Sequence, residues 1–163
     1  MTQQRATYAQ AGVDVESGER AVELMRASIV ASTRPEVVGD FGGFAGLFDI
    51  SAAKLMRKPL LATSTDGVGT KIAVARALDI HHTVGLDLVA MVVDDLVVCG
   101  AEPLFMTDYI AVGSVNPERI ASIVSGIARG CELAGCSLVG GETAEHPGLM
   151  APDEYDIAGA GTG

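Results

Sequence analysis

The spacing of apolar and polar positions changes several times along the chain, and each change marks a different expected element. Four stretches repeat apolar residues at helical spacing, which predicts helices at 18–33, 72–78, 84–98 and 117–134. Four shorter apolar runs predict strands at 60–65, 104–112, 136–139 and 155–160. Between the first helix and the first strand, residues 39–46 include four glycines in eight positions and are expected to form a loop.

Residues that favour helix ends sharpen two of these boundaries. Ser17 is a possible N-cap of the first helix. Asn116 is a good N-cap for the last helix, and Pro117 suits its first position. Gly135 follows the apolar stripe of that helix and is expected to end it.

The expected order of elements is α, β, α, α, β, α, β, β, which mixes helices and strands without strict alternation. This order predicts an α+β fold in which helices cover one face of a mixed β-sheet. Helix 84–98 is apolar almost all round, so it is expected to be largely buried. The other face of the sheet also needs a cover, and dimerisation is our hypothesis for how it is provided.

Length and composition indicate one globular domain. The chain has 163 residues, of which 48% are hydrophobic and 20% are charged, so it can build a substantial core. The glycine-rich end, Gly159 to Gly163, is typical of a cut at a domain junction, although a flexible terminus has the same composition.

Charge and cysteine content argue against several classes of function. Acidic residues outnumber basic ones by 21 to 11, and no basic patch is present to bind nucleic acid. No run approaches the ~18 apolar residues of a membrane span, and the polar start is unlike a secretion signal. Cys99, Cys131 and Cys136 form no C-x-x-C pair, so we expect them in the core of a cytoplasmic protein.

Three aspartates in the apolar helix 84–98 are the first candidates for chemistry. Asp87, Asp94 and Asp95 would each be costly to bury without a partner. One interpretation is a narrow solvated stripe on the helix. The other is Mg²⁺ binding, since this ion prefers carboxylate oxygens, and the absence of basic residues from this helix favours the metal.

The segment 66–71, Asp-Gly-Val-Gly-Thr-Lys, joins an expected strand to an expected helix. Its glycines allow a ligand to approach the backbone closely, and successive N–H groups in such a turn can bind an anion. Thr70 and Lys71 would open a helix whose N-terminus favours phosphate. The alternative is an ordinary strand–turn–helix corner, since the Walker A pattern is absent.

Glu142 follows two glycines after strand 136–139 and is either a third metal ligand or a solvated acid in a turn. The histidines His81, His82 and His146 are interpreted as surface or substrate-proximal residues. Taken together, the acids, the lysine after a glycine turn and the glycine-rich loop predict an ATP–Mg²⁺ site without a P-loop. Phosphoryl transfer needs little beyond such charge neutralisation and positioning.

Four segments resemble those of a known family: 66–71, 84–91 (VGLDLVAM), 95–105 (DLVVCGAEPLF) and 137–145 (SLVGGETAE). They are similar to the phosphoribosylformylglycinamidine cyclo-ligases, also called aminoimidazole ribonucleotide synthetases. Segments 8–14, 34–37 and 42–44 fit the N-terminal part of that family. The resemblance covers only the N-terminal half of those enzymes, so it implies a C-terminal domain that completes the active site.

The resemblance implies an ATP-dependent ring closure in purine biosynthesis. ATP would phosphorylate the formamide oxygen of formylglycinamidine ribonucleotide, and a ring-closing nitrogen would then displace phosphate to give aminoimidazole ribonucleotide and ADP. A cytoplasmic homodimer is implied, with the two sheets forming one barrel. Residues 1–50 would hold a helix and a glycine-rich flap, and residues 51–163 would form the ATP-binding and dimerisation domain.

Position by position, the resemblance also implies roles for residues. The metal ligands would be Asp66, Asp95 and Glu142, and the catalytic residues Asp66 and Lys71. The ATP-binding residues would be Gly42, Gly43, Phe44, Asp66, Gly67, Gly69, Thr70, Lys71, Asp95 and Glu142. Asp94 stands where the family usually has Asn, and His82 where it often has Asp. No role follows for those two, nor for Asp14, Asp87 and Asp108.

Two other interpretations stay open. The first is an ATP-using relative, such as selenophosphate synthetase or thiamine-monophosphate kinase. A selenophosphate synthetase would be expected to carry a cysteine or selenocysteine near its N-terminus, yet no cysteine precedes Cys99. The second is a dimerisation module without activity, because half of the implied active site lies outside this sequence.

Overall fold

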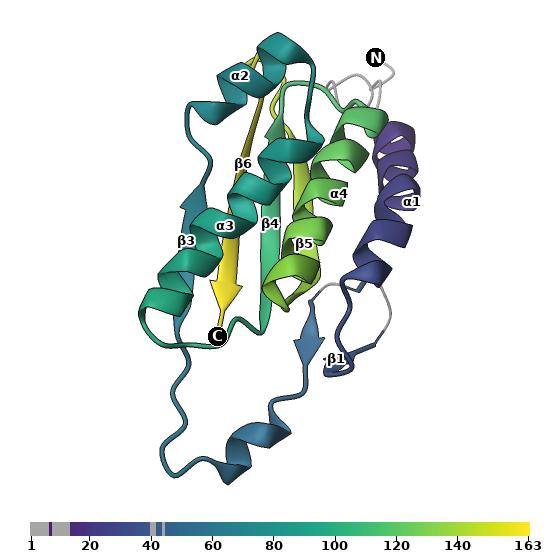
Figure 1. Cartoon of the computed structure of the whole chain (residues 1–163). Coiled ribbons are helices and arrows are strands. Elements are labelled where there is room, and N and C mark those ends of the chain that lie inside the picture. Colours follow the sequence, from purple (N-terminus) through teal and green to yellow (C-terminus); the bar gives the residue numbers. More distant parts are fainter. Residues whose placement is uncertain (1–6, 8–13, 40–41, 44) are drawn as a thin grey trace, which may run out of the picture.

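A computed structural model describes residues 7, 14–39, 42–43 and 45–163. Figure 1 shows a sheet with long helices packed along it. In chain order the elements are α1 (Val15–Ala31), β1 (Val37–Val38), β2 (Leu47–Phe48), a 3₁₀ helix (Ser51–Leu55), β3 (Thr63–Gly67), α2 (Lys71–Leu78), α3 (His82–Val98), β4 (Phe105–Val112), α4 (Pro117–Ala134), β5 (Ser137–Glu145) and β6 (Tyr155–Thr162).

The main sheet has four strands in the order β3-β6-β4-β5. β6 is antiparallel to both of its neighbours, β3 and β4. β4 and β5 are parallel, because the connection between them is the helix α4, which returns the chain to the same end of the sheet. β3 and β5 are therefore the two edge strands. β1 and β2 form a separate two-stranded antiparallel sheet.

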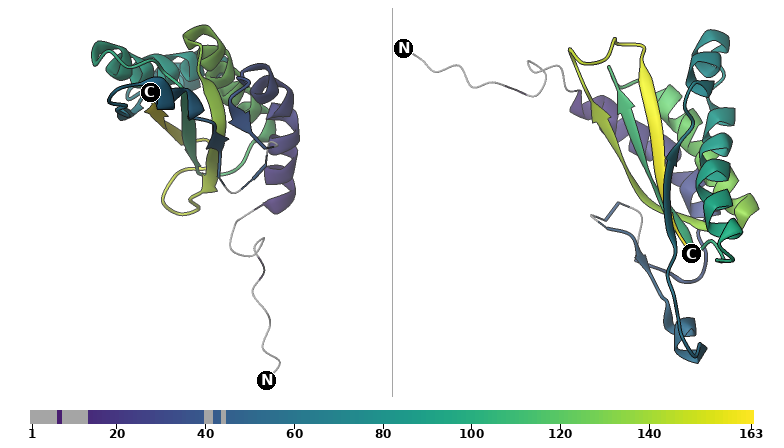
Figure 2. Two further views of the ribbon diagram at one scale, coloured as in Figure 1. Left: turned by 90° about the horizontal axis from the view of Figure 1, so that it is seen from below. Right: turned by 90° about the vertical axis from the view of Figure 1, so that its left-hand side faces the viewer.

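The long helices all lie on one face of this sheet (Figure 2). α3 packs on β3 and β6, α4 lies beside α3 and contacts β4 and β5, and α1 packs against α4. The predicted α+β class, a mixed sheet with helices on one face, is confirmed. Within the described part of the chain, no helix covers the other face.

Helices α3 and α4 cross closely because each has a glycine at the contact. A side chain on Gly126 would overlap the carbonyl oxygen of His82, and one on Gly85 would overlap that of Ile123. Any larger residue would push the two backbones apart. The close crossing holds a core against the sheet whose fully buried side chains include Leu88, Val92, Ile110, Ile123, Ile127 and Ile157.

Side chains explain where two helices begin. α1 begins earlier than expected because Asp14, and not Ser17, is its N-cap: the Asp14 carboxylate accepts a hydrogen bond from the Ser17 N–H at 3.0 Å. Asn116 caps α4 as predicted and accepts from the Arg119 N–H at 2.9 Å. Gly135 ends α4 in the left-handed region, with φ of 71°.

Two strands differ from their expected bounds. β3 begins at Thr63, because Leu60 and Leu61 lie outside the sheet with 77% and 68% of their surface exposed. β5 extends to Glu145 instead of ending at residue 139, because pairing with β4 carries the strand through two glycines. Glu142 consequently lies within a strand and not in a turn after one.

Helix α3 is buried on one side only. Its residues Leu88 and Val92 are fully buried, whereas Val97 and Val98 expose 54% and 81% of their surface. The expectation of a largely buried helix is therefore wrong for its outer side, since α2 and α4 cover only part of it. Within the described ranges no helix is long and apolar enough to cross a bilayer.

Candidate functional site

The strand β3 carries Asp66 to the start of a tight turn. The Asp66 carboxylate accepts a hydrogen bond from the Gly67 N–H at 2.7 Å. Gly69 has φ of 59°, a left-handed conformation that glycine adopts without strain. Thr70 then precedes Lys71, the first residue of α2. The predicted strand–turn–helix corner is present, with its backbone at the N-terminus of a helix.

An aspartate of α3 holds the Lys71 side chain. The Lys71 Nζ lies 3.1 Å from the Asp87 Oδ1, and the two side chains are 44% and 45% exposed. The lack of basic residues within helix 84–98 had favoured a metal as the partner of its aspartates, but α2 supplies a lysine instead. Exposed pairs of this kind contribute at most about 1 kcal/mol, so a phosphate group could compete for Lys71.

Asp95 is held against β3. Its Oδ2 accepts a hydrogen bond from the Ser64 hydroxyl at 2.9 Å. Ser64 therefore faces α3. Asp66 is two residues beyond Ser64 along the strand, so the Asp66 side chain projects to the same face. Asp66, Lys71, Asp87 and Asp95 therefore make up one region, called here the β3–α3 flank.

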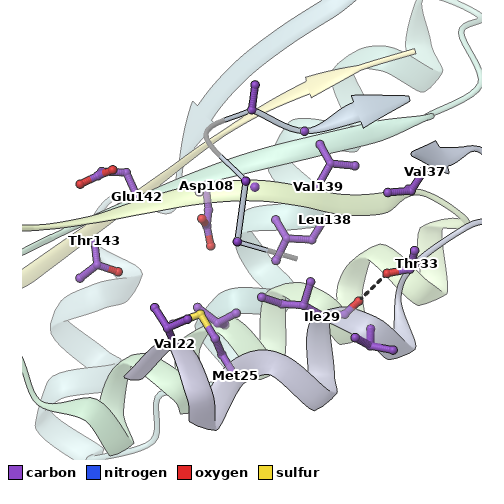
Figure 3. A pocket seen from close by; sticks show the side chains of 18 of the residues that line it. Val22, Met25, Ile29, Thr33, Val37, Asp108, Leu138, Val139, Glu142 and Thr143 are labelled. Carbon is purple, nitrogen blue, oxygen red and sulfur yellow. Dashed lines mark hydrogen bonds between the residues drawn. The ribbon is translucent and has the colours of Figure 1, made fainter. Parts of the chain in front are cut away.

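Glu142 lies far from this flank. β5 and β3 are opposite edges of the sheet, and three strand spacings amount to about 14 Å. Glu142 also points to the open face, whereas Asp108 and Thr143 point toward α1 (Figure 3). The expected convergence of Asp66, Asp95 and Glu142 is thus not seen within one chain. Across the described ranges, no group of three His, Cys, Asp or Glu side chains could hold a metal ion.

The solvated-stripe interpretation accounts for the remaining aspartate of α3. Asp94 is exposed, and so is its neighbour Asp95, although the Asp95 carboxylate bonds to Ser64 at the edge of the sheet. Water can solvate these carboxylates, so folding of α3 does not require a cation next to them. Asp94, which stands where the resembled family usually has Asn, therefore adds a negative charge to the exposed surface of the helix.

A cavity of about 600 Å³ lies between α1 and β5. The apolar side chains of α1 form one wall, and β5 forms the opposite wall (Figure 3). Gly42 and Gly43, from the predicted flap, contribute to its lining. Phe44, the third residue of that flap, lies outside the described residues.

Asp108 projects from β4 into this cavity (Figure 3). The residue is partly exposed, but its Oδ2 is shielded from solvent and has no hydrogen-bond partner. Burial raises the pKa of the carboxyl group to about 7, because it disfavours the charged form. Gly141, its register partner on β5, leaves room for it: a Cβ at that position would overlap the Asp108 carboxylate.

Sequence reasoning assigned no role to Asp108, although a signal was available. Asp108 shares its side of β4 with Met106 and Ile110, which are 1% and 0% exposed. An acid at an inward position of an alternating strand is unusual, because an unpaired buried carboxylate is costly. The alternation alone could therefore have marked it as a candidate.

The histidines differ from one another. His81 is only 7% exposed, and its ring nitrogens lie 2.9 Å from the Tyr155 hydroxyl and 2.9 Å from the Asp79 carboxylate. Its predicted surface position is wrong, because the chain between α2 and α3 turns the ring against β6. His82 is exposed as predicted, and the His146 Nε2 lies 3.1 Å from the exposed Tyr109 hydroxyl.

The cysteines also separate into two groups. Cys131 and Cys136 are buried in the core, as predicted. Cys99 is exposed, contrary to the prediction, because it caps the end of α3 beyond the part that packs on the sheet. All three are free thiols.

Comparison with known proteins identifies the family. The family model described as AIR synthase related protein, N-terminal domain, matches residues 47–163. The phosphoribosylformylglycinamidine cyclo-ligase of Geobacillus thermodenitrificans is 59% identical over 152 residues, which are 93% of this chain and 44% of that protein. The protein of the same name from Trichlorobacter lovleyi is 55% identical over 159 residues, covering 98% of this chain and 45% of the relative. The chain thus spans less than half the length of these relatives.

Solved structures share the fold at low identity. Thiamine-monophosphate kinase from Stenotrophomonas maltophilia K279a has a TM-score of 0.64 and 18% identity, covering 88% of this chain and 41% of that one. Hydrogenase maturation protein HypE in complex with ATP has a TM-score of 0.65 and 18% identity, covering 90% and 39%. The match of residues 47–163 shows that the chain belongs to the AIR synthase related protein family and contains its N-terminal domain.

Proposed function

We propose that this chain is the N-terminal part of an ATP-dependent cyclo-ligase, which closes the imidazole ring of aminoimidazole ribonucleotide in the cytoplasm. Identities of 59% and 55% to proteins named phosphoribosylformylglycinamidine cyclo-ligase, along nearly the whole chain, carry this proposal. Thiamine-monophosphate kinase shares the fold but only 18% of the sequence, so it is the weaker candidate. Residues 1–50, with α1 and the flap, and the domain 51–163 would need a C-terminal domain to complete the active site.

The reaction needs an activated formamide. Transfer of the terminal phosphoryl group of ATP to the formamide oxygen gives an imidate phosphate and ADP. The ring-closing nitrogen then attacks the same carbon, and the carbon–oxygen bond breaks to release phosphate. The protein's contribution to such a transfer is mainly to position the groups and to stabilise negative charge.

The β3–α3 flank has the groups that this step requires. Mg²⁺ commonly uses one or two protein carboxylates together with phosphate oxygens and water, and it neutralises charge on a triphosphate. Asp66 and Asp95 fit that donor set, because Asp66 projects from β3 to the side that α3 covers, and Asp95 of α3 bonds to Ser64 on that same side. The turn at Gly67 and Gly69 would present backbone N–H groups to the phosphates, with Thr70 at the helix start and the Lys71 ammonium nearby.

A homodimer would complete the sheet and is part of this proposal. β3 and β5 run in the same direction and are both edge strands. If β5 of one copy lay beside β3 of the other, eight strands would close into a barrel, and the open faces would be covered. Glu142 of one copy would then lie on the strand next to β3 of the other copy, although Glu142 points to the open face and Asp66 to the face that α3 covers. Sedimentation should show a dimer, and a strictly monomeric full-length enzyme would contradict this arrangement.

Replacement of Asp66 by Asn tests the proposed metal site. In the full-length enzyme, we expect Asp66→Asn to reduce ring closure by at least about a hundredfold, as loss of a key charge-stabilising group does. The thermal unfolding temperature should stay near that of the wild type. The assay measures aminoimidazole ribonucleotide and ADP from formylglycinamidine ribonucleotide and ATP.

Asp94→Asn is the matched control. It makes the same replacement at an exposed carboxylate next to Asp95 in the chain, and it introduces the residue usual in the family. We expect this variant to retain activity. Wild-type turnover by Asp66→Asn would remove Asp66 from the site. Failure of the wild-type full-length enzyme to form product from these two substrates would overturn the proposed function itself.

A further inference from the structure

The hairpin formed by β1 and β2 carries the glycine-rich loop 39–46 and is separate from the main sheet. Within the described residues, β1 and β2 pair only with each other, and Val38 and Leu47 are exposed. An isolated two-stranded hairpin is at best marginally stable in water. Side-chain contacts must therefore hold this hairpin, and the loop that it carries, against the domain.

Arg34 lies at the base of this hairpin, just before β1. Its carbonyl oxygen accepts a hydrogen bond from the Val37 N–H at 3.1 Å. Its guanidinium donates to both oxygens of the Glu36 carboxylate, from Nε at 3.2 Å and from Nη2 at 3.3 Å. The same group lies over the ring of Phe48 in β2, 5.6 Å from the ring centroid. Arg34 thus contacts both sides of the hairpin.

The remaining nitrogen of the Arg34 guanidinium reaches two connections of the main domain. Nη1 donates to the Gly135 carbonyl oxygen at 2.9 Å, at the end of α4, and to the Pro103 carbonyl oxygen at 3.4 Å, before β4. It also pairs with the Glu102 carboxylate at 3.3 Å. The Arg34 N–H donates to the Ser137 hydroxyl oxygen at 2.8 Å. One residue therefore joins the hairpin to the starts of β4 and β5.

Arginine is the side chain best suited to this set of contacts. Its planar fork presents five N–H donors, whereas lysine carries a single ammonium group on a flexible stem. The Arg34 side chain is 23% exposed. The Glu36 carboxylate that bonds to it raises the pKa of Arg34, so the guanidinium stays charged. Hydrogen bonds from a charged donor are stronger than those between neutral groups, so this residue can hold the hairpin firmly.

The end of the loop rests on β5. Gly46, which precedes β2, lies so close to Val139 that a Cβ at residue 46 would overlap the Val139 carbonyl oxygen. Gly42 and Gly43 line the cavity between α1 and β5, called here the α1–β5 cavity. The loop is therefore placed from two sides, by Gly46 against the strand and by Arg34 at the base. A loop that is already in place need not be ordered when a ligand binds, so less binding free energy is lost.

We propose that Arg34 is a positioning residue for ATP binding: its guanidinium holds the β1–β2 hairpin to the connections before β4 and β5, and so fixes the glycine-rich loop that would contact ATP. The inference rests on the proposed function, which gives this loop its ligand. Arg34 acts through the loop and needs no contact with ATP of its own. Its loss should therefore weaken ATP binding more than it slows the chemical step.

Arg34→Ala in the full-length enzyme tests this role. We expect KM for ATP to rise about tenfold or more, because the loop then has to be ordered on binding, while kcat changes less than about threefold. Guanidinium ion at millimolar concentration should restore much of the lost affinity, since it can occupy the vacated place. Arg20→Ala is the matched control and should leave KM unchanged, because Arg20 pairs with Glu118 on the surface, where both side chains are exposed.

Hydrogen exchange measures the hairpin without turnover. The Asp49 N–H donates to the Glu36 carbonyl oxygen at 2.7 Å. In Arg34→Ala this amide should exchange at least about tenfold faster, whereas the amides of β4 should keep their wild-type rates. Arg34→Lys provides a second variant in case Arg34→Ala does not fold. It keeps the charge but not the fork, so we expect it to raise KM for ATP several-fold.

Two results would overturn the inference. In the first, Arg34→Ala and Arg34→Lys keep the wild-type KM for ATP. In the second, exchange in the hairpin is unchanged in Arg34→Ala, so that the hairpin is held without this side chain. If the wild-type full-length enzyme forms no product from ATP and formylglycinamidine ribonucleotide, the proposed function fails instead. ATP affinity measured by calorimetry then replaces KM, and the same comparison of Arg34→Ala with the wild type decides the inference.

Discussion

The β3–α3 flank and the α1–β5 cavity hold carboxyl groups under opposite conditions. On the flank, Asp95 is exposed and Asp87 is paired with Lys71, so each charge is solvated or compensated. In the cavity, the shielded oxygen of Asp108 has no partner, and burial raises the pKa of the group to about 7. The carboxylates of the flank can therefore bind a cation. The carboxyl group of Asp108 in the cavity is a hydrogen-bonding group that is only partly ionised near neutral pH.

This difference shows that the residues of a recognisable sequence motif need not be the residues whose pKa the fold shifts. Asp66 and Lys71 belong to a short contiguous segment, which makes them visible in the sequence. Asp108 owes its environment to a glycine on another strand and to a helix at the other end of the chain. Exposed groups such as those of the flank are suited to binding a ligand that is still solvated. A shielded group such as Asp108 is suited to distinguishing between ligands in a site from which water is excluded.

The largest expected effect is a pH dependence of the free energy of unfolding, and it tests whether Asp108 differs from the acids of the flank. The folded-state pKa of Asp108 is about 7, above its ordinary value of 3.8. Between these values the folded chain keeps a proton that the unfolded chain has released, so this group makes the chain less stable as pH rises. Asp108→Asn removes the effect, and its free energy of unfolding should gain on that of the wild type by up to about 4 kcal/mol from pH 4 to pH 8.

Denaturant unfolding at several pH values measures this gain. Asp94→Asn is the control, because its carboxylate is exposed and its difference from the wild type should stay nearly constant with pH. A difference between Asp108→Asn and the wild type that does not change over this range would show that Asp108 is solvated like the acids of the flank.

A smaller effect is expected from Gly141→Ala, which tests the packing of the cavity acid. The new Cβ would overlap the Asp108 carboxylate, and overpacking of this kind typically costs about 1–3 kcal/mol of stability. Gly140→Ala is the matched control, since its Cβ would have no neighbour closer than 3.9 Å. Chemical denaturation of both variants gives the comparison.

The same substitution in an Asp108→Ala background should cost much less, because the overlapping oxygens are gone. Equal costs for Gly141→Ala in the two backgrounds would mean that the glycine serves some other purpose. The double-mutant cycle therefore separates contact with Asp108 from the general effect of alanine in a strand.

The smallest effect concerns the ion pair of the flank. A double-mutant cycle with Lys71→Ala and Asp87→Ala should give a coupling free energy below about 1 kcal/mol, because both side chains are nearly half exposed. Added salt should reduce it further. A coupling of several kcal/mol that salt does not change would place this pair in a buried environment and remove the contrast with the cavity.

Local patterns in the sequence predicted most of the elements. The cap at Asn116 with Pro117, and the stop at Gly135, placed α4 correctly because those residues act through hydrogen bonds to their immediate neighbours. The strand around residues 155–160 and the helix 72–78 followed from side-chain spacing in the same way. The prediction ended β5 too early, because glycine normally signals a turn and its pairing with β4 cannot be read locally.

The candidate site was only partly predictable for the same reason. Asp66, Gly67, Gly69, Thr70 and Lys71 form one corner, as expected from their contiguity. Whether Glu142 lies near them depends on strand order, and one chain places it at the opposite edge of the sheet. Lys71 also meets Asp87 across two helices, a contact for which the sequence has no marker.

By itself, the sequence determined the kinds of elements, several of their ends, and the motifs that place the chain in its family. These properties depend on hydrogen bonds and side-chain spacing within a few residues. Only the tertiary structure decided which edge holds Glu142, which face each acid points to, and that Gly141 makes room for Asp108. Those outcomes depend on which strands pair and in what register, and such pairing is set by contacts between residues far apart in the chain.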